Sequence, residues 1–383
     1  MYSRILNYPD DKSFFLFGPR GTGKTTWVKS RFPDAVYIDL LESEIFNDLI
    51  ANPQRLELFI PESYNGFIII DEVQRIPELL NEVHRLIEKN GYKFILTGSS
   101  ARKVRSSGQN LLGGRALTRS FHPLTCFELK ESFSLNHSLQ FGNLPCAYTE
   151  KDPKSYLESY VNTYLEEEIR QEGLTRNLGG FARFLESASF SQGAVLNISA
   201  VARDCGIHRK VVEHYFLILE ELLIAYRIPV FSKKAKRRLS KHPKFYFFDV
   251  GVFRTVRPMG PLDSPEKAEG VAFESLFLQE LIAVNNTMNL GYRIYYWQTS
   301  NNIEVDFVLY GNKGFLAFEL KRTAKVNNRH LSGLKSFMRD YPMAKPFCIY
   351  GGTRRLYDGK IEILPVEYAL RHLGEILEFL KSD

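Results

Sequence analysis

Short apolar runs alternate with amphipathic stretches over residues 1–130. Runs of four or five apolar residues predict buried strands, and stretches with apolar residues at three- and four-residue steps predict helices. Such an alternation is typical of a parallel sheet covered by helices. The predicted strands are Phe14–Phe17, Val36–Leu40, Phe67–Ile70, Phe94–Thr97 and Thr118–Phe121.

The middle of the chain has a helical period. Residues 153–190 read as helical, and within them Glu166–Glu168 are expected on a solvated face, because consecutive helix positions point apart. A short helix over Ile198–Ala202, a turn at Cys205–Ile207 and a longer helix over His208–Tyr226 follow. A glycine in the turn between two helices is a cue for a helix-turn-helix motif. The buried stripe of the longer helix is expected to hold Val211, Val212, Tyr215, Phe216, Leu219, Leu222 and Leu223.

Two alternating segments near the C-terminal end, Ile303–Tyr310 and Phe315–Lys321, predict a β-hairpin with Asn312 and Lys313 at its tip. If these two residues form the loop, Asp306 lies opposite Glu319, and Glu304 lies opposite Lys321. Alternation then places these four side chains on one face of the hairpin. The other face is the expected core side and holds Val305, Phe307, Leu309, Leu316, Phe318 and Leu320.

Composition bounds the class of protein. A chain of 383 residues predicts two or three domains, and 44% hydrophobic residues suffice for ordinary buried cores. Neither a signal peptide nor an apolar run long enough to span a membrane is recognisable, so no membrane partner is expected. The four cysteines form no C-x-x-C pair, which indicates reduced thiols in a cytoplasmic protein. They are Cys126, Cys146, Cys205 and Cys348.

Positive charge is concentrated in one region. The whole chain has a net charge of +6, whereas residues 201–260 alone have 13 basic residues against 5 acidic ones. Arg209, Lys210 and His214 lie off the apolar stripe near the start of the longer helix, where groove-reading residues usually sit. The basic run Lys233–Arg238 follows, as a wing would. We therefore predict DNA binding through backbone contacts, with protein binding by the same winged helix as the alternative.

Residues Gly18–Thr25 have the pattern G-x-x-x-x-G-K-T directly after the first predicted strand. Glycines let backbone amides close around the β- and γ-phosphates of a nucleotide, and a helix that starts near Gly23 points its positive end at them. Lys24 can reach the terminal phosphates, and the Thr25 hydroxyl can bind Mg²⁺. The alternative is a turn that binds nothing. The predicted site for ATP and Mg²⁺ holds Gly18, Pro19, Arg20, Gly21, Thr22, Gly23, Lys24, Thr25 and Thr26.

Two later strand ends carry further candidates for this site. Asp71 and Glu72 follow the strand Phe67–Ile70, which is the pattern of a Walker B element. Asp71 would then hold Mg²⁺ through water, and Glu72 would orient and deprotonate the attacking water. At the next strand end, Thr97 or Ser99 could sense the γ-phosphate, or could cap a helix; both interpretations stay open.

Arg115 follows a stretch rich in arginine, serine and glycine that ends in Gly113-Gly114. An arginine so placed could act as a finger on a nucleotide bound by its own chain or by a neighbouring subunit. Many Gly-Arg pairs have no such role. Arg115 is therefore a catalytic candidate beside Lys24 and Glu72, in cis or in trans.

The opposed carboxylates of the hairpin have a chemical interpretation. Two carboxylates directly opposed repel each other and weaken a strand pair. A divalent cation between Asp306 and Glu319 reverses that effect, and the Lys321 ammonium can orient a nucleophile or stabilise developing phosphate charge. The alternative is a solvated face with an ordinary ion pair between Glu304 and Lys321.

These motifs together carry a resemblance. They look like a prokaryotic AAA-type ATPase family whose members join an N-terminal AAA domain to a C-terminal domain of uncertain function with a nuclease-like core. The resemblance implies an activity that acts on or is controlled by DNA, in an oligomer whose Arg115 completes a neighbour's site. The segments that carry it are Gly18–Thr25, Ile70–Glu72, Leu96–Ser99, Gly114–Arg115 and Phe121–Leu124.

The hairpin resembles the D…E-x-K layout of PD-(D/E)xK nucleases, with Asp306, Glu319 and Lys321 in its places. Glu274, in a predicted helix, matches the acidic residue that this group often contributes, and so becomes a third candidate metal ligand. Val305 stands where the layout has proline.

We therefore predict an α/β protein of three domains: a P-loop AAA-type domain over 1–130, a helical region over 131–260 with a winged helix-turn-helix at about 195–245, and a restriction-endonuclease-like domain over 261–383. The predicted function is a Mg²⁺-dependent ATPase that binds DNA, with a nuclease-like C-terminal domain. The alternative is a nucleotide-gated signalling or scaffold switch whose C-terminal domain binds nucleic acid without cutting it.

Overall fold

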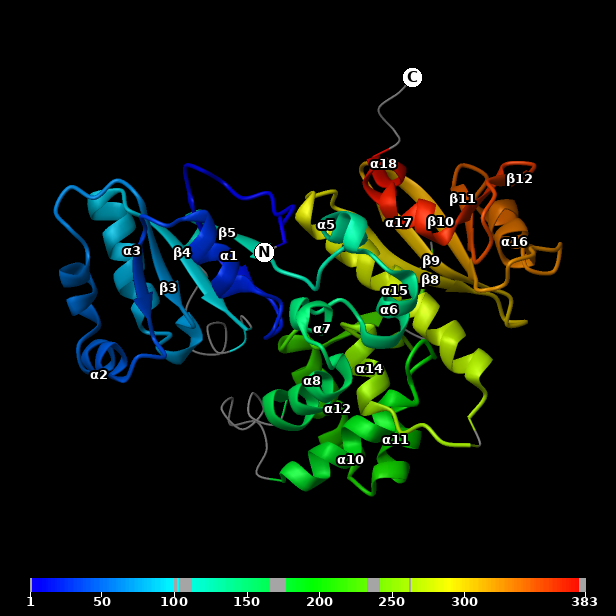
Figure 1. Cartoon of the computed structure of the whole chain (residues 1–383), viewed down its shortest axis with the longest axis horizontal. Helices are drawn as coiled ribbons and strands as arrows, with labels where there is room; N and C mark the ends of the chain where they lie inside the picture. Colours follow the sequence, from blue (N-terminus) through cyan, green and yellow to red (C-terminus); the bar gives the residue numbers. More distant parts are fainter. Residues whose placement is uncertain are drawn as a thin grey trace. The chain divides into compact units, whose positions relative to one another are not determined.

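The computed structural model describes residues 2–99, 102, 112–165, 177–232, 242–261 and 263–378. The chain divides into two compact units (Figure 1). The smaller unit is Arg4–His122 with Glu221–Leu223, and the larger unit is Met1–Ser3, Pro123–Glu220 and Ile224–Asp383. The larger unit contains the third predicted domain and all of the second except Glu221–Leu223, so the boundary between these two stays a prediction.

The smaller unit is built on a parallel sheet with the strand order β2-β3-β4-β1-β5. This confirms the five predicted strands, with ends that differ by one or two residues. The strands read as continuous apolar runs because helices cover both faces. They are β1 (Ser13–Phe17), β2 (Val36–Asp39), β3 (Phe67–Asp71), β4 (Lys93–Gly98) and β5 (Ala116–Ser120).

Alternate residues of β1 enter two different cores, one on each face of the sheet. Phe14 and Leu16 pack with Trp27 of α1, whereas Phe15 and Phe17 lie in the core that α3 covers. Figure 1 shows α1 and α3 on opposite sides of this sheet. The helical segments are α1 (Lys24–Arg31), α2 (Ser43–Ala51), η1 (Pro53–Phe59), η2 (Val73–Arg75), α3 (Leu79–Asn90) and η3 (Leu112–Gly114).

The first part of the larger unit is mostly helical. Where one helical segment was predicted over 153–190, the described residues form α8, η5 and α10, and Glu166–Glu168 lie outside them. None of the described helices is long and apolar enough to cross a membrane. The segments are α5 (Cys126–Leu129), η4 (Lys130–Ser132), α6 (Leu135–Phe141), α7 (Pro145–Thr149), α8 (Pro153–Ser159), η5 (Tyr160–Leu165), α10 (Leu178–Ser189), α11 (Ile198–Cys205), α12 (Arg209–Glu221) and α14 (Val250–Val256).

The two helices of the predicted helix-turn-helix are α11 and α12. Between them Gly206 has a φ of 67°, a left-handed conformation that favours glycine and ends α11. The prediction that the second helix reaches Tyr226 was wrong, because β6 (Ala225–Ile228) pairs with β7 (Lys244–Phe247) in an antiparallel ribbon. Long-range pairing overrides the local helical period at this point.

The predicted stripe of the second helix was wrong at two positions, Val211 and Leu223. Leu223 lies past the end of α12 and is only partly buried. Val211 is 40% exposed, whereas Ile218, which was not predicted, is fully buried. Both lie at the margins of the apolar arc, and the sequence period does not show where the packing of a helix against its neighbours begins.

The C-terminal part of the larger unit is a mixed sheet with the strand order β12-β13-β11-β10-β9-β8. One face packs against α15, α17 and α18, and the other packs against α16 (Figure 1). The strands are β8 (Arg293–Gln298), β9 (Glu304–Gly311), β10 (Gly314–Lys321), β11 (Lys345–Tyr350), β12 (Leu356–Asp358) and β13 (Ile361–Pro365). The helices are α15 (Pro265–Thr287), α16 (Ser332–Asp340), α17 (Val366–Arg371) and α18 (Leu373–Glu378).

The predicted hairpin register is confirmed. Phe318 lies opposite Phe307, and Gly314 lies opposite Gly311. The prediction of a single core face was wrong, because both faces of the hairpin are covered. In addition, β9 carries a bulge where it pairs with the segment of β8 between Tyr295 and Trp297. The extra residue reverses the alternation, so Val305 joins the core on the α16 side instead of the core that holds Phe307.

Candidate functional sites

The phosphate-binding loop follows β1 and leads into α1. Gly21 and Gly23 have φ values of 81° and 89°, which glycine adopts without strain. A Cβ on Gly18 would lie 2.2 Å from the carbonyl oxygen of Phe121, so a larger residue does not fit there. The loop therefore needs these glycines for its own conformation.

Lys24 lies inside this loop. Its side chain is buried, and its ammonium donates hydrogen bonds to the carbonyl oxygens of Gly18, at 2.6 Å, and Pro19, at 3.1 Å. The Thr22 hydroxyl donates to the same Pro19 oxygen at 2.8 Å. A positive charge is thus held where the loop would enclose a phosphate. Of the other predicted loop residues, Arg20 is half-buried and Thr26 is exposed.

The Asp71 carboxylate, at the end of β3, collects hydroxyl donors from three elements. Thr25 of α1 donates to its Oδ2 at 2.9 Å, and the hydroxyls of Thr97 on β4 and Tyr37 on β2 also donate to this carboxylate. Tyr37 was not predicted; its signal, a tyrosine in a strand, does not differ from that of a core residue. Burial, with the hydrogen bond to Asp71, raises the pKa of Tyr37 well above its ordinary value, so it remains a donor.

The carboxylate of Glu72, the next residue, is held by an amide. The backbone of Glu72 is left-handed, with a φ of 60°, a conformation that is costly without glycine and recurs at functional sites. Gln74 Nε2 donates to Glu72 Oε2 and, at 3.2 Å, to the Ser99 hydroxyl. The structure therefore brings Glu72 and Ser99 together through Gln74, a residue that the sequence did not single out.

Arg115 lies in a different environment. Its guanidinium forms an exposed ion pair with Glu88 of α3, and such pairs add little stability. Its proposed role as an arginine finger stays a prediction.

Arg4 is a further residue that no motif indicated. Its guanidinium donates to the carbonyl oxygens of Thr22, at 2.9 Å, and His122, at 2.6 Å, and lies 4.0 Å from the centroid of the Phe121 ring. Burial lowers the pKa of His122 to about 3, with a contribution from the charge of Arg4. Arg4 thus joins the phosphate-binding loop to His122, the last residue of the first segment of the smaller unit.

The second candidate site lies in the larger unit, where α15 approaches the ends of β9 and β10. Glu274 of α15 accepts a hydrogen bond from the Tyr246 hydroxyl, and its Oε1 lies 3.5 Å from Lys244 Nζ. The same ammonium lies 3.6 Å from Glu304 Oε2. Lys244 was not predicted, because its place in this cluster depends on the pairing of β7, which is distant in sequence.

Asp306 and Glu319 are both 5% exposed. Asp306 Oδ2 accepts a hydrogen bond of 2.7 Å from the Leu320 amide, and Glu319 Oε1 lies 2.6 Å from Lys321 Nζ. Glu319 Oε2 is buried and has no hydrogen-bond partner among the described residues. The expected alternative, an ion pair between Glu304 and Lys321, was wrong: Lys321 pairs with Glu319, and Glu304 pairs with Lys244.

Burial controls the protonation of this cluster. It raises the pKa of Glu319 well above the ordinary value, and the charge of Asp306 adds to this effect. It also raises the pKa of Glu274, to about 7. Burial alone would lower the pKa of Lys244 and Lys321, but the surrounding carboxylates outweigh it and raise both. Both lysines are therefore charged in a site that has excess negative charge.

The five predicted metal ligands belong to two predicted sites, Thr25 and Asp71 in the smaller unit and Glu274, Asp306 and Glu319 in the larger one. Within the described ranges, no three histidine, cysteine, aspartate or glutamate side chains come together as a group that could hold a metal ion. Thr25 and Asp71 contact each other in the smaller unit, Asp306 and Glu319 lie together in the larger one, and Glu274 faces Lys244.

The candidate DNA-binding residues of α12 were predicted to lie off its apolar stripe. Arg209, Lys210 and His214 are exposed. The basic run Lys233–Arg238 lies outside the described residues.

Residues 10–130 match a family model described as "AAA domain". They form an AAA-type P-loop domain. Residues 133–263 and 269–369 match two models described as domains of unknown function, DUF8612 and DUF4143.

Over 379 residues, the chain is 23% identical to "Uncharacterized protein Rv2008c" of Mycobacterium tuberculosis and to "Uncharacterized protein Mb2031c" of Mycobacterium bovis, with 96% of this chain and 83% of each relative covered. Among solved structures, it is similar to the ORC1 protein of Aeropyrum pernix in complex with DNA, at 13% identity and a TM-score of 0.24 over 65% of this chain and 87% of that one. It is also similar to protein VC1899 from Vibrio cholerae, at 13% identity and a TM-score of 0.23 over 96% of this chain and 98% of that one. At these scores neither structure bears on the function of this chain.

Proposed function

We propose that this protein is a Mg²⁺-dependent ATPase that binds DNA. The convergence of hydroxyl groups from α1, β2 and β4 on the Asp71 carboxylate supports this proposal most directly, because it lies beside the lysine of the phosphate-binding loop.

Each candidate site residue described above for the smaller unit, apart from Arg115, has a role in this reaction. The loop amides and Lys24 stabilise the phosphate oxygens as charge develops on them. Thr25 and Asp71 would hold Mg²⁺, which would neutralise phosphate charge. Glu72 accepts a proton from the water that attacks the γ-phosphorus in line, while Gln74 and Ser99 fix the direction of its carboxylate.

Two substitutions separate binding from hydrolysis. Lys24→Ala should abolish ATP turnover. Glu72→Gln should still bind ATP with near-normal affinity, but its rate of hydrolysis should fall at least about 10²-fold. Calorimetric titration and phosphate release measure the two quantities. Lys89→Ala and Glu78→Gln, exposed positions of the same unit, are matched controls. Turnover near wild type in Glu72→Gln would remove Glu72 from this role, and absence of ATP binding by folded wild-type protein would refute the ATPase.

DNA binding is proposed for the helix-turn-helix region. The exposed basic residues of α12, followed by the β6–β7 ribbon, support a winged-helix arrangement that faces a polyanion. Arg209→Glu with Lys210→Glu should weaken binding of a DNA duplex and reduce the salt dependence of its affinity. Fluorescence anisotropy at several salt concentrations measures both, with Lys151→Glu plus Lys154→Glu as the control.

A protein-binding switch is the second candidate. Val211 and Leu217 of α12 are 40% and 42% exposed, and such apolar area favours a protein partner over phosphate contacts. DNA affinity that is undetectable, or indifferent to salt, would favour this candidate.

We propose in addition that Asp306 and Glu319 bind one divalent cation in a restriction-endonuclease-like domain, with Lys321 beside it. Two buried carboxylates, one with an oxygen that lacks a partner, support this cation site. Whether the site cuts is testable on plasmid DNA with Mg²⁺ or Mn²⁺. Cutting that survives both Asp306→Ala and Lys321→Ala would exclude this site as its source.

A further inference from the structure

We infer that the Lys244 ammonium neutralises Glu274 and Glu304 in place of a metal ion. A divalent cation in the larger unit then binds at Asp306 and Glu319 and not at Glu274. This inference rests on the cation site proposed above. It removes one predicted metal ligand and assigns a role to a residue outside the D…E-x-K layout.

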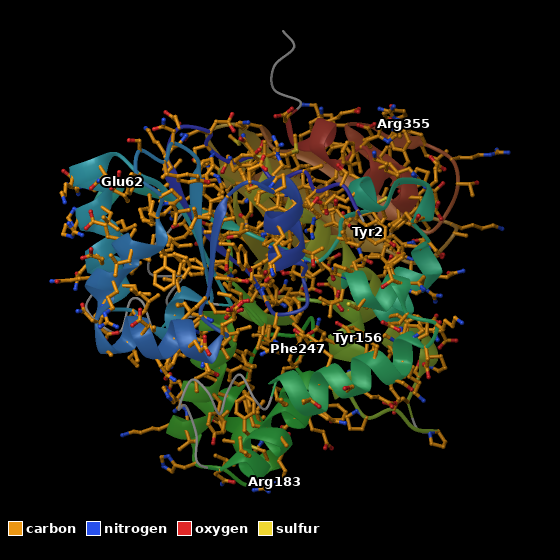
Figure 2. All side chains as sticks on the ribbon, turned by 60° about the vertical axis from the view of Figure 1, so that its left-hand side comes forward. Tyr2, Glu62, Tyr156, Arg183, Phe247 and Arg355 are labelled. Carbon is orange, nitrogen blue, oxygen red and sulfur yellow. The ribbon has the colours of Figure 1, made fainter. Side chains whose placement is uncertain are left out.

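The backbone of Lys244 is fixed on both sides. Lys244 lies on β7, the strand that also carries Phe247, labelled in Figure 2. It pairs with Ile228 of β6 and forms a bridge to Val195, while hydrogen bonds from Leu196 to Pro243 and from Phe245 to Ala194 hold its chain neighbours. The ammonium can therefore move away from the carboxylates only by rotation about its side-chain bonds.

The side chain of Lys244 is only 4% exposed. Burial of an ammonium is costly unless carboxylates pair with it, and those within ion-pair distance of Lys244 are Glu274 and Glu304. The charge of Asp306 also favours the protonated lysine. Tyr246, two residues along the same strand and hence on the same face, donates to the same oxygen of Glu274. Two donors from one strand thus occupy one of the two oxygens of Glu274, Oε1.

The charges of the cluster support one divalent cation. Its four carboxylates are Glu274, Glu304, Asp306 and Glu319, and its ammonium groups are those of Lys244 and Lys321. When a bound cation keeps all four carboxylates ionised, two negative charges remain, and they equal the charge of one Mg²⁺ or Mn²⁺ ion. The part of the cluster that Lys244 does not contact contains the buried Glu319 oxygen without a partner. A single ion at this place would satisfy both the charge and the oxygen.

Mn²⁺ binding to the full-length chain without nucleotide tests the inference. Electron paramagnetic resonance and calorimetry count the ions, and every variant keeps the same P-loop, so differences arise in the larger unit. Glu274→Gln should change the Mn²⁺ dissociation constant less than about threefold, whereas Asp306→Asn should raise it at least about tenfold, as expected when a charged ligand is lost. Glu266→Gln, an exposed position of α15, is the matched control.

Substitution of the lysine tests the same claim from the other side. Lys244→Met, which removes the charge, should bind a second Mn²⁺ ion and gain a larger increase in melting temperature from Mn²⁺ than wild type. Lys244→Arg should keep one ion. If Lys244→Met does not fold, the Glu274→Gln and Lys244→Arg results still decide the question.

The outcomes separate the two proposals. If Glu274→Gln weakens Mn²⁺ binding as much as Asp306→Asn does, the inference is overturned while the cation site stands. A folded Lys244→Met that binds no second ion also overturns it. If wild type binds no Mn²⁺ that depends on Asp306, the cation site itself is refuted, and the inference with it.

Discussion

In the smaller unit, Asp71 is surrounded by the hydroxyl groups of Thr25, Tyr37 and Thr97, whereas in the larger unit Glu274 and Glu319 face the ammonium groups of Lys244 and Lys321. A hydroxyl donor orients a carboxylate and leaves its charge uncompensated, whereas an ammonium removes most of that charge. If the proposed function is correct, Asp71 would hold a cation that arrives with a nucleotide. The cluster in the larger unit already contains two cations of its own.

This difference predicts how each site responds when a charge is removed. Loss of the Asp71 charge should affect cation binding and turnover directly, with little effect on the fold. In the larger unit, a change at one charged group should disturb its partners as well, since each ammonium there offsets a buried carboxylate.

The largest expected effect is that of Asp71→Asn. The substitution keeps the shape of the side chain, removes its charge and turns an amide N–H toward hydroxyl donors. ATP turnover should fall about 10²–10³-fold, the scale of losing one electrostatic group at a reacting phosphate. Phosphate release measures turnover, and circular dichroism monitors the fold. Asp48→Asn, at a partly exposed position on α2, is the control; an Asp71→Asn variant within tenfold of wild type would contradict the role.

Gly333→Ala tests the packing of the cluster in the larger unit. A Cβ on Gly333, in the first turn of α16, would lie 2.1 Å from the Glu304 carbonyl oxygen and 3.1 Å from Glu319 Oε2. Because the first of these atoms belongs to the backbone, the free energy of unfolding should fall by about 3 kcal/mol. Chemical denaturation measures it. Gly270→Ala on α15, where a Cβ meets nothing within 4 Å, should be neutral or slightly stabilising. Equal stabilities of the two variants would show that α16 can move away from β9.

The comparison also shows what a sequence can reveal about each site. The P-loop and Asp71-Glu72 are contiguous motifs whose spacing reflects local geometry, so their residues were predictable. The hairpin register followed from alternation and loop length alone. By contrast, the bulge in β9 moves Val305 to the other core, and no local pattern in β9 marks the extra residue.

Residues that act across long sequence distances escaped prediction for a related reason. Arg4 contacts a loop that begins 14 positions later, and Lys244 reaches a helix 30 positions away. Each is an ordinary basic residue in sequence, and only tertiary pairing gives it a specific partner. Gln74 lies two residues from Glu72, but a glutamine after a strand end has too many common roles to stand out.

Asp249 extends the comparison to a third kind of donor, the backbone amide. It caps α14 by accepting hydrogen bonds from Gly251 and Val252, and it also accepts one from Asn143. Burial outweighs these bonds and raises its pKa to about 6. Since the folded state then binds a proton more tightly than the unfolded state, this group stabilises the fold at low pH, and the contribution is lost as pH rises toward 6.

From pH 4.5 to pH 7, Asp249 should lower the free energy of unfolding by about 2 kcal/mol. Asp249→Asn cannot titrate, so its stability should change with pH by that much less than the stability of wild type, even though the variant is weaker overall. Urea denaturation at both pH values gives the difference. An unchanged pH dependence in the variant would mean that Asp249 keeps an ordinary pKa.

Arg4→Lys should have the smallest effect, and it tests whether a cation in the smaller unit can act on the backbone rather than on a carboxylate. Arg4 uses two nitrogens of one planar group to join the carbonyl oxygens of Thr22 and His122, a geometry that a lysine ammonium does not reproduce. The variant keeps the charge, so any effect reports the planar guanidinium, through its two hydrogen bonds and its contact with the Phe121 ring. Loss of one such bond, worth about 1.4 kcal/mol, should raise the KM for ATP about tenfold. The kcat should change less than about threefold, because Arg4 shapes the loop and does not touch the reacting atoms.

Steady-state kinetics separates the two constants, with Arg31→Lys, exposed on α1, as the control. A fall in kcat with unchanged KM would instead place Arg4 among the groups that act on the transition state.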